Sequence, residues 1–364
     1  MTAGRIALLA LAAASLVAAV LGGLARLGVS IAVPTAAANH GVLMTGGFLG
    51  CVISLERAIA LGRPYAYAAP LAAGLGAALL LAGFRDAGLV VSLAAPVVLL
   101  AVGIVLVRRQ PLTHIVLLVV ASSCWLAGDA FLLAGAQPDV CAAWWFAFLV
   151  LTIAAERLEM TRLARRAPAA AWLFGAAVVL VLCGALLQSW RMDVGGVVFA
   201  AGLVAVAAWC AAFDVARRTV RTGGYARYAA IALLAGYAWL AVAGIAWAAM
   251  SAGHGAWRDA ALHALGLGFV FSMVLAHAPV VVPVVARRRL RYSPLLYVPL
   301  ALLHASLLVR LAGGAQSFAL RRWGGILDAV ALLAFAGTLA FTLARSGSAE
   351  SKPRTTAESR RSCV

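Results

Sequence analysis

Two histidines stand out in an otherwise apolar stretch of the sequence, DAALHALGLGFVFSMVLAHAPVVVP. His263 and His277 are fourteen residues apart, close to four turns of an α-helix, so their imidazoles project from nearly the same helix face. At about 1.5 Å per residue, they are separated by about 21 Å along the helix axis. One apolar helix is therefore expected to carry two polar groups at two different depths.

The composition indicates that this helix belongs to a membrane protein. Of the 364 residues, 65% are hydrophobic and 11% are charged, and the mean hydropathy is +1.02, outside the range of a soluble globular domain. Apolar windows of about 20 residues, the length that crosses a hydrocarbon core, recur along the chain. The twelve predicted spans are 6–25, 38–60, 66–84, 88–107, 112–134, 141–161, 169–188, 194–214, 228–250, 259–284, 293–311 and 324–344. We predict an all-α polytopic membrane protein with one transmembrane domain, residues 1–345, and a disordered cytoplasmic tail, residues 346–364.

Basic residues are unevenly distributed between the two sets of connecting loops. With twelve spans and both termini in the cytoplasm, 22 of the 29 basic residues lie on the cytoplasmic side and 7 on the opposite side. This bias follows the positive-inside rule and predicts a multi-pass protein of a bacterial inner membrane. The same arginines are scattered over short loops and form no continuous basic domain, which argues against a nucleic-acid partner. The lipid bilayer is the expected partner.

A weak internal repeat aligns three of the predicted spans. The aligned segments are GFLGCVISLERAIAL (47–61), AFLVLTIAAERLEMT (147–161) and GFVFSMVLAHAPVVV (268–282). The alignment brings Glu56, Glu156 and His277 into register and favours three four-helix pseudo-repeats. The topology places these side chains toward the inner face, where ionisable groups at one depth are costly unless they bind something or one another. We expect an inner polar cluster there, a proton path or a second site; pairing of each glutamate with the arginine after it is the structural alternative.

A second group of histidines is expected toward the outer face. His40 on the second span, His263 on the tenth and His304 on the eleventh have similar predicted depths. Neutral imidazole is a ligand of haem iron, copper and zinc, and a non-covalent haem in a helical bundle requires axial ligands and a slot between helices. We take His40 and His263 as the best ligand pair for a haem or a metal, and His304 as a reserve ligand. A hydrogen bond from each histidine to a neighbouring helix is the structural alternative.

The segment HALGLGFVFSMVLA, with His263, Gly268 and Met273, resembles the NnrS family, twelve-span haem- and copper-binding bacterial membrane proteins associated with resistance to nitric oxide. More distantly, twelve spans in three four-helix units are similar to subunit I of haem–copper oxidases, which holds its low-spin haem through histidines on the second and tenth spans. The resemblance implies haem b, copper, and a small gas ligand such as nitric oxide. It also implies a function in nitrosative stress or respiratory redox chemistry. In the NnrS family this helix continues into an arginine and ends in a segment that contains Gly-His, whereas this chain continues as HAPVVVPVVARRR.

Two other classes of protein remain open. In a cofactor-free secondary transporter, Pro279 and Pro283 would break the tenth span at 277–283 and expose main-chain groups to a substrate. In a membrane assembly factor, the histidines would only brace helices. The sequence does not decide whether the protein is an enzyme, and a Soret band in purified protein would separate the haem protein from both alternatives.

Overall fold

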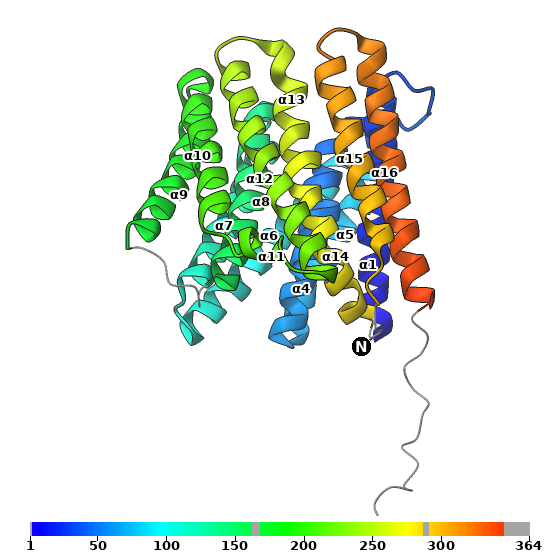
Figure 1. The fold of residues 1–364 in the computed structure, drawn as a ribbon. Coiled ribbons are helices and arrows are strands. Elements are labelled where there is room, and N and C mark those ends of the chain that lie inside the picture. Colours follow the sequence, from blue (N-terminus) through cyan, green and yellow to red (C-terminus); the bar gives the residue numbers. More distant parts are fainter. Residues whose placement is uncertain (1, 162–167, 287–290, 346–364) are drawn as a thin grey trace, which may run out of the picture.

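The computed structural model describes residues 2–161, 168–286 and 291–345, and within these ranges every regular element is a helix (Figure 1). Twelve of the described helical segments are long and apolar enough to cross a membrane. The prediction of an all-α, twelve-span membrane protein is therefore confirmed. The predicted tail lies outside the described residues.

Eight spans are single α-helices and four are composite. The single helices are α1 (Thr2–Arg26), α6 (Arg85–Arg109), α7 (Thr113–Leu133), α8 (Pro138–Met160), α9 (Pro168–Gln188), α10 (Met192–Phe213), α12 (Gly224–Ser251) and α16 (Phe318–Arg345). The second span contains α3 (His40–Val42), η1 (Leu43–Gly50) and α4 (Cys51–Leu61), and the third contains η2 (Pro64–Tyr67) and α5 (Ala68–Leu81). The tenth contains η3 (Gly255–Trp257), α13 (Arg258–His263), η4 (Ala264–Val270) and α14 (Phe271–Ala286), and the eleventh η5 (Pro294–Leu296), α15 (Tyr297–Leu308) and η6 (Val309–Gly313). Two short helices lie in connections, α2 (Pro34–Ala38) and α11 (Ala216–Thr219).

The bundle has two distinct ends because its spans alternate in direction. The start of α1 and the end of α16 lie at one end, which we call the near end (Figure 1). The connections that follow α1, α12 and η6 lie at the opposite end, which we call the far end. The second and tenth spans both begin at the far end, so each carries its first histidine there.

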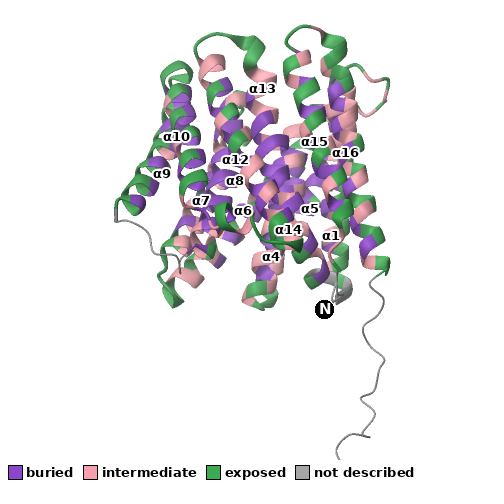
Figure 2. Ribbon diagram, in the orientation of Figure 1, coloured by how far each residue is buried: buried purple, intermediate pink, exposed green. Residues whose placement is uncertain are grey.

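Helix α8 is the centre of the bundle. In its apolar window 83% of the residues are buried, whereas the share in the other spans is between 28% and 61%, and the buried residues concentrate around α8 in Figure 2. Close approach depends on small residues, as is usual between membrane helices. A Cβ atom on Gly50 would lie 2.4 Å from the ring of Trp125, and one on Gly128 would lie 2.5 Å from Trp145. Both indoles therefore pack directly on a neighbouring main chain.

Three spans change from α-helical to π-helical winding in their far halves. The π-helical segments are η1, η4 and η6; His40 lies three residues before the first, His263 immediately precedes the second, and Arg310 belongs to the third. A π-helical turn re-aims the side chains around it and is frequent at functional sites. The sequence pattern did not predict these changes.

The tenth span is not broken where its prolines suggested. Pro279 and Pro283 both lie inside α14, which continues to Ala286. Membrane helices tolerate proline because neighbouring groups satisfy the freed carbonyls. The irregular winding of this span lies earlier, in η4, beside His263.

Candidate functional site

A cavity of about 790 Å³ lies between the far halves of α1, α8, α16 and the second and tenth spans. Its volume falls in the range of about 300–1,000 Å³ that is usual for small-molecule and cofactor sites. The aromatic side chains of Trp145, Phe146 and Phe271 line it together with two histidines, His40 and His263. The structure thus brings together the two residues that the sequence analysis paired as ligands.

The imidazole of His40 is anchored through one of its two nitrogens. Its Nδ1 lies 2.7 Å from the main-chain oxygen of Ala19 on α1. A carbonyl oxygen only accepts hydrogen bonds, so Nδ1 carries the hydrogen and Nε2 carries a lone pair. Nε2 has no hydrogen-bond partner among residues 2–161, 168–286 and 291–345, and the side chain lines the cavity. Helix α1 can approach because Gly23 faces the ring, where a Cβ atom would lie 3.0 Å from Cε1 of His40.

His263 is anchored in the same way, one helical turn from its acceptor. Its Nδ1 lies 3.0 Å from the main-chain oxygen of Asp259 and 3.1 Å from the Oδ1 atom of the same residue. Nη2 of Arg310 lies 3.0 Å from Nε2 and 3.4 Å from Nδ1. A group that approached Nε2 along its lone pair, in the ring plane, would lie much farther from Nδ1, because the ring stands between the two. Nη2 of Arg310 therefore lies over the face of the ring, away from the in-plane direction of the Nε2 lone pair.

Arg310 is the centre of a buried ionic network behind His263. Its guanidinium donates to both carboxylate oxygens of Asp259, at 2.9 and 3.1 Å, and its Nη1 lies 3.4 Å from Oδ2 of Asp328. The hydroxyl of Ser306 donates to the other oxygen of Asp328 at 2.6 Å. Arg310 and Asp328 are both buried. The network joins α13, α15, η6 and α16, and it fixes the position of the arginine over the imidazole.

His304 is placed apart from the two cavity histidines. Its Nδ1 accepts a hydrogen bond of 3.0 Å from Nε1 of Trp239 on α12, and the two rings stack with their centroids 6.5 Å apart. His304 is not among the residues that line the cavity. Its Nε2 is buried and has no hydrogen-bond partner in the described part of the chain. The structure therefore does not bring the proposed reserve ligand to the pair.

The three residues that the internal repeat aligned lie toward the near end of the bundle, and two of them, Glu156 and His277, contact arginines. Nη2 of Arg57 donates to Oε1 of Glu156 at 2.7 Å, which joins the second and sixth spans. Glu56 forms no ion pair with the described residues. Nη2 of Arg157 lies 2.8 Å from Nε2 of His277, which joins the sixth and tenth spans. Each arginine thus contacts a residue of another span, and Glu156 pairs with Arg57, not with the arginine that follows it in sequence.

His277 has no ring nitrogen left for a ligand. Its Nδ1 lies 2.7 Å from the main-chain oxygen of Met273, so the lone pair is on Nε2 and accepts from Arg157. His277 therefore cannot bind a further ligand through either ring nitrogen. Nε of the buried Arg157 has no hydrogen-bond partner among the described residues.

Sequence reasoning missed the charged residues that surround His263. Asp259 and Arg310 lie at or near ends of predicted spans, and Asp328 lies within one. An ionisable residue inside a membrane span marks a functional or paired position by default, so Asp328 was the available signal. The residues that pair with Asp328 could not be predicted, because they depend on how each helix is rotated about its axis.

Fold and cavity define a polytopic α-helical membrane protein with a ligand-sized site in the far half of its bundle. Residues 5–344 match the family described as a domain of unknown function, DUF8744, and the chain belongs to this family. No curated protein and no solved structure matches the chain.

Proposed function

We propose that the protein is an integral membrane haem protein of NnrS-like type, whose far-end cavity holds haem b between His40 and His263. One observation carries this proposal. Two imidazoles line the same cavity, each with Nδ1 anchored to a main-chain carbonyl and with the in-plane lone pair of Nε2 available. Metal-ligating histidines commonly have this arrangement, since the bond at one nitrogen fixes the tautomer and ring orientation needed at the other.

The donor set favours a haem over a bare metal ion. Within the described ranges no group of three or more His, Cys, Asp and Glu side chains is placed to hold a metal. A bare zinc or copper ion usually takes three or four protein ligands, whereas haem iron requires one or two. The two histidines therefore support copper binding less well than haem binding. The apolar lining, which includes Trp145 and Phe146, would cover a macrocycle and exclude water.

Bound haem would supply an iron that exchanges an electron, or that binds a small gas ligand in place of one of the two histidines. The protein's own residues would perform three tasks. His40 and His263 would hold the iron, and the carbonyls of Ala19 and Asp259 would orient the two rings. Arg310, held by Asp259 and Asp328, would cover one face of the His263 ring. Nitric oxide is the gas ligand that the NnrS resemblance suggests, in the nitric oxide response or respiratory redox chemistry.

We place the protein in a bacterial inner membrane with the near end in the cytoplasm, on the 22-to-7 distribution of basic residues. The cavity would then face the periplasm, and the cluster around Glu156 and His277 would lie toward the cytoplasm, where it would exchange protons. A reporter fused after Arg345 is expected to read cytoplasmic, and one inserted in the loop after α12 periplasmic. The reverse pattern would overturn this orientation.

A cofactor-free secondary transporter is the second candidate. The observation that favours it is the change of winding around the cavity in η1, η4 and η6, where altered main-chain hydrogen bonding could present carbonyl oxygens to a substrate. In that case His40 and His263 would bind substrate, and the purified protein would carry no haem.

The test is an absorbance spectrum of protein purified under haem-replete conditions. The haem proposal predicts a Soret band in the wild type, its loss or a change of coordination in His40→Ala and His263→Ala, and little change in His277→Ala. His304→Ala is the matched control, because this histidine pairs with Trp239 and does not line the cavity. A wild type without a Soret band would favour the transporter, and equal spectra in all variants would remove the proposed ligand pair.

A further inference from the structure

The charges that line the far-end cavity are not balanced. Four arginines contribute to its lining. Arg258 forms an ion pair with Asp139, with 2.5 Å between Nη2 and Oδ1, and Arg310 lies between two aspartates. The other two, Arg26 and Arg321, form no ion pair with any residue of the described ranges. With Asp139, Asp259 and Asp328 set against the four arginines, the cavity carries one net positive charge, and Arg26 and Arg321 are the two arginines outside the ion pairs.

These two arginines lie at adjacent helix ends. Arg26 is the last residue of α1, and Arg321 lies in the first turn of α16. The two ends pack closely, since a Cβ atom on Gly325 would lie 2.3 Å from Cδ1 of Leu27. Both arginines line the cavity from its far-end margin, which we call the rim. Two like charges at one margin favour an anion between them.

Neither rim guanidinium is saturated with acceptors. Nη2 of Arg321 donates to the main-chain oxygen of Gly314 at 2.9 Å, while its Nε is buried without a partner. Arg26 makes no hydrogen bond with the described residues, and it lies one helical turn after Gly23, which faces the ring of His40. A guanidinium has five donors in a planar fork that matches a carboxylate. Both rim arginines retain donors for such a partner.

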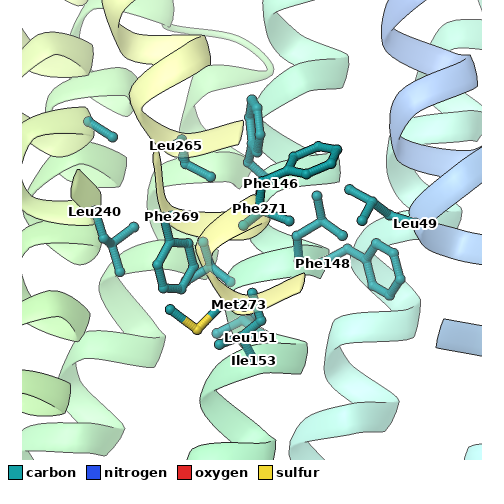
Figure 3. Close-up of a cluster of buried hydrophobic side chains, with 14 of the residues drawn as sticks. Leu49, Phe146, Phe148, Leu151, Ile153, Leu240, Leu265, Phe269, Phe271 and Met273 are labelled. Atoms are coloured by element: carbon teal, nitrogen blue, oxygen red, sulfur yellow. The ribbon is translucent and has the colours of Figure 1, made fainter. Parts of the chain in front are cut away.

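The opposite side of the cavity is apolar. Its floor includes Leu49, Phe146 and Phe271, which lie together beside α8 and η4 (Figure 3). A ligand that matches the cavity at both ends would combine an apolar body with anionic groups at one edge. The two histidines line the space between this floor and the rim.

We propose that Arg26 and Arg321 form a carboxylate-binding subsite at the rim, which orients a planar amphipathic ligand with its carboxylates toward the far end. This inference rests on the proposed function: for haem, the carboxylates are its two propionates, and the apolar edge of the macrocycle faces Phe146 and Phe271. The subsite would fix which way round the macrocycle enters the cavity. It would contribute affinity independently of the iron, because it binds the carboxylates of the ligand and not the iron.

The experiment compares haem with its dimethyl ester, in which both propionates are masked, by titration of haem-free protein in lipid nanodiscs. Quenching of tryptophan fluorescence reports binding, since Trp145 lines the cavity. The wild type should bind haem at least about tenfold more tightly than the ester, as the loss of one or more charge-assisted hydrogen bonds requires. Metal-free protoporphyrin and its dimethyl ester should differ by a similar factor, because this contrast does not involve the iron.

The variant Arg26→Gln/Arg321→Gln should lose this preference and leave the Kd of the ester unchanged, whereas Arg26→Lys/Arg321→Lys should retain part of it. Arg85→Gln is the matched control, because Arg85 is exposed at the far end but does not line the cavity. Equal affinity of the wild type for haem and ester would overturn the rim subsite and leave the haem proposal standing. A wild type that binds neither would overturn the proposed function and the subsite with it.

Discussion

The two histidines of the tenth span are held alike at one ring nitrogen and differently at the other. His263 and His277 each place Nδ1 within 3.0 Å of the carbonyl oxygen one turn earlier. At His277 the guanidinium of Arg157 approaches Nε2 alone and takes its lone pair. At His263, Nη2 of Arg310 lies within 3.4 Å of both nitrogens and so over the face of the ring. Nε2 of His277 is therefore occupied by a hydrogen bond within the protein, whereas Nε2 of His263 remains available to a ligand.

The arginines explain this difference. Arg310 is held by Asp259 and Asp328, so its hydrogen bonds are satisfied without the imidazole. Arg157 has no carboxylate in ion-pair contact within the described residues, and His277 is its acceptor. A buried cation needs an acceptor, because desolvation is costly when nothing compensates it. An arginine lies against a histidine in both halves of the bundle, but only His263 keeps a ring nitrogen for a ligand.

The largest effect is expected from Arg310→Met. This change leaves the buried Asp328 and the half-buried Asp259 without their cation, and breaking a buried ionic network costs about 3–5 kcal/mol. We expect a strongly lowered midpoint of thermal unfolding in nanodiscs. Arg322→Met is the matched control, since Arg322 is exposed on the same helix as Asp328 and should have little effect. A loss of stability no larger than that of the control would show that the network does not hold the far end together.

Arg157→Met should cost less, although Arg157 is equally buried. The change leaves Nε2 of His277 as an unsatisfied acceptor, worth about 1–3 kcal/mol, but it also removes a buried cation that has no carboxylate partner. The two contributions oppose each other. The same thermal measurement should rank this variant below Arg310→Met in its effect. The reverse order would mean that Arg157 has an anionic partner and that the comparison of the two halves is wrong.

The smallest effect is expected from Glu156→Gln. Its ion pair with Arg57 is half-buried, with side-chain exposures of 24% and 18%, so its loss should cost about 1 kcal/mol after allowance for solvent screening. Asp193→Asn, at a solvent-exposed pair with Arg191, is the control and should be neutral.

A Glu56→Gln/Glu156→Gln variant with an unchanged pH dependence of haem reduction would limit the inner cluster to a structural role.

The sequence was sufficient for features that depend on local composition. The twelve spans follow from hydropathy alone, and matched depths of His40 and His263 follow from span order and direction. The repeat alignment placed Glu56, Glu156 and His277 at one level of the bundle, and two of them, Glu156 and His277, contact arginines there. These properties require only the position of a residue along its own helix.

The remaining features depend on how each helix is rotated about its axis. Most spans are apolar on all sides, so the pattern does not show which face meets which neighbour. Hence the sequence could not show that His304 turns toward Trp239, that Arg57 reaches Glu156 on another span, or that Arg310 covers His263. The π-helical segments add to this uncertainty, because each shifts the faces of the residues that follow it.

The central claim is that Nε2 of His40 and Nε2 of His263 are open to a ligand while Nε2 of His277 is not. Imidazole rescue tests it most directly, using spin-resonance and optical spectra of His40→Gly, His263→Gly and His277→Gly purified with haem. We expect the first two to lose an axial ligand and added imidazole to restore the wild-type spectrum, whereas the third should be unchanged with or without imidazole. Wild-type coordination in His40→Gly and His263→Gly without imidazole, or its loss in His277→Gly, would contradict it.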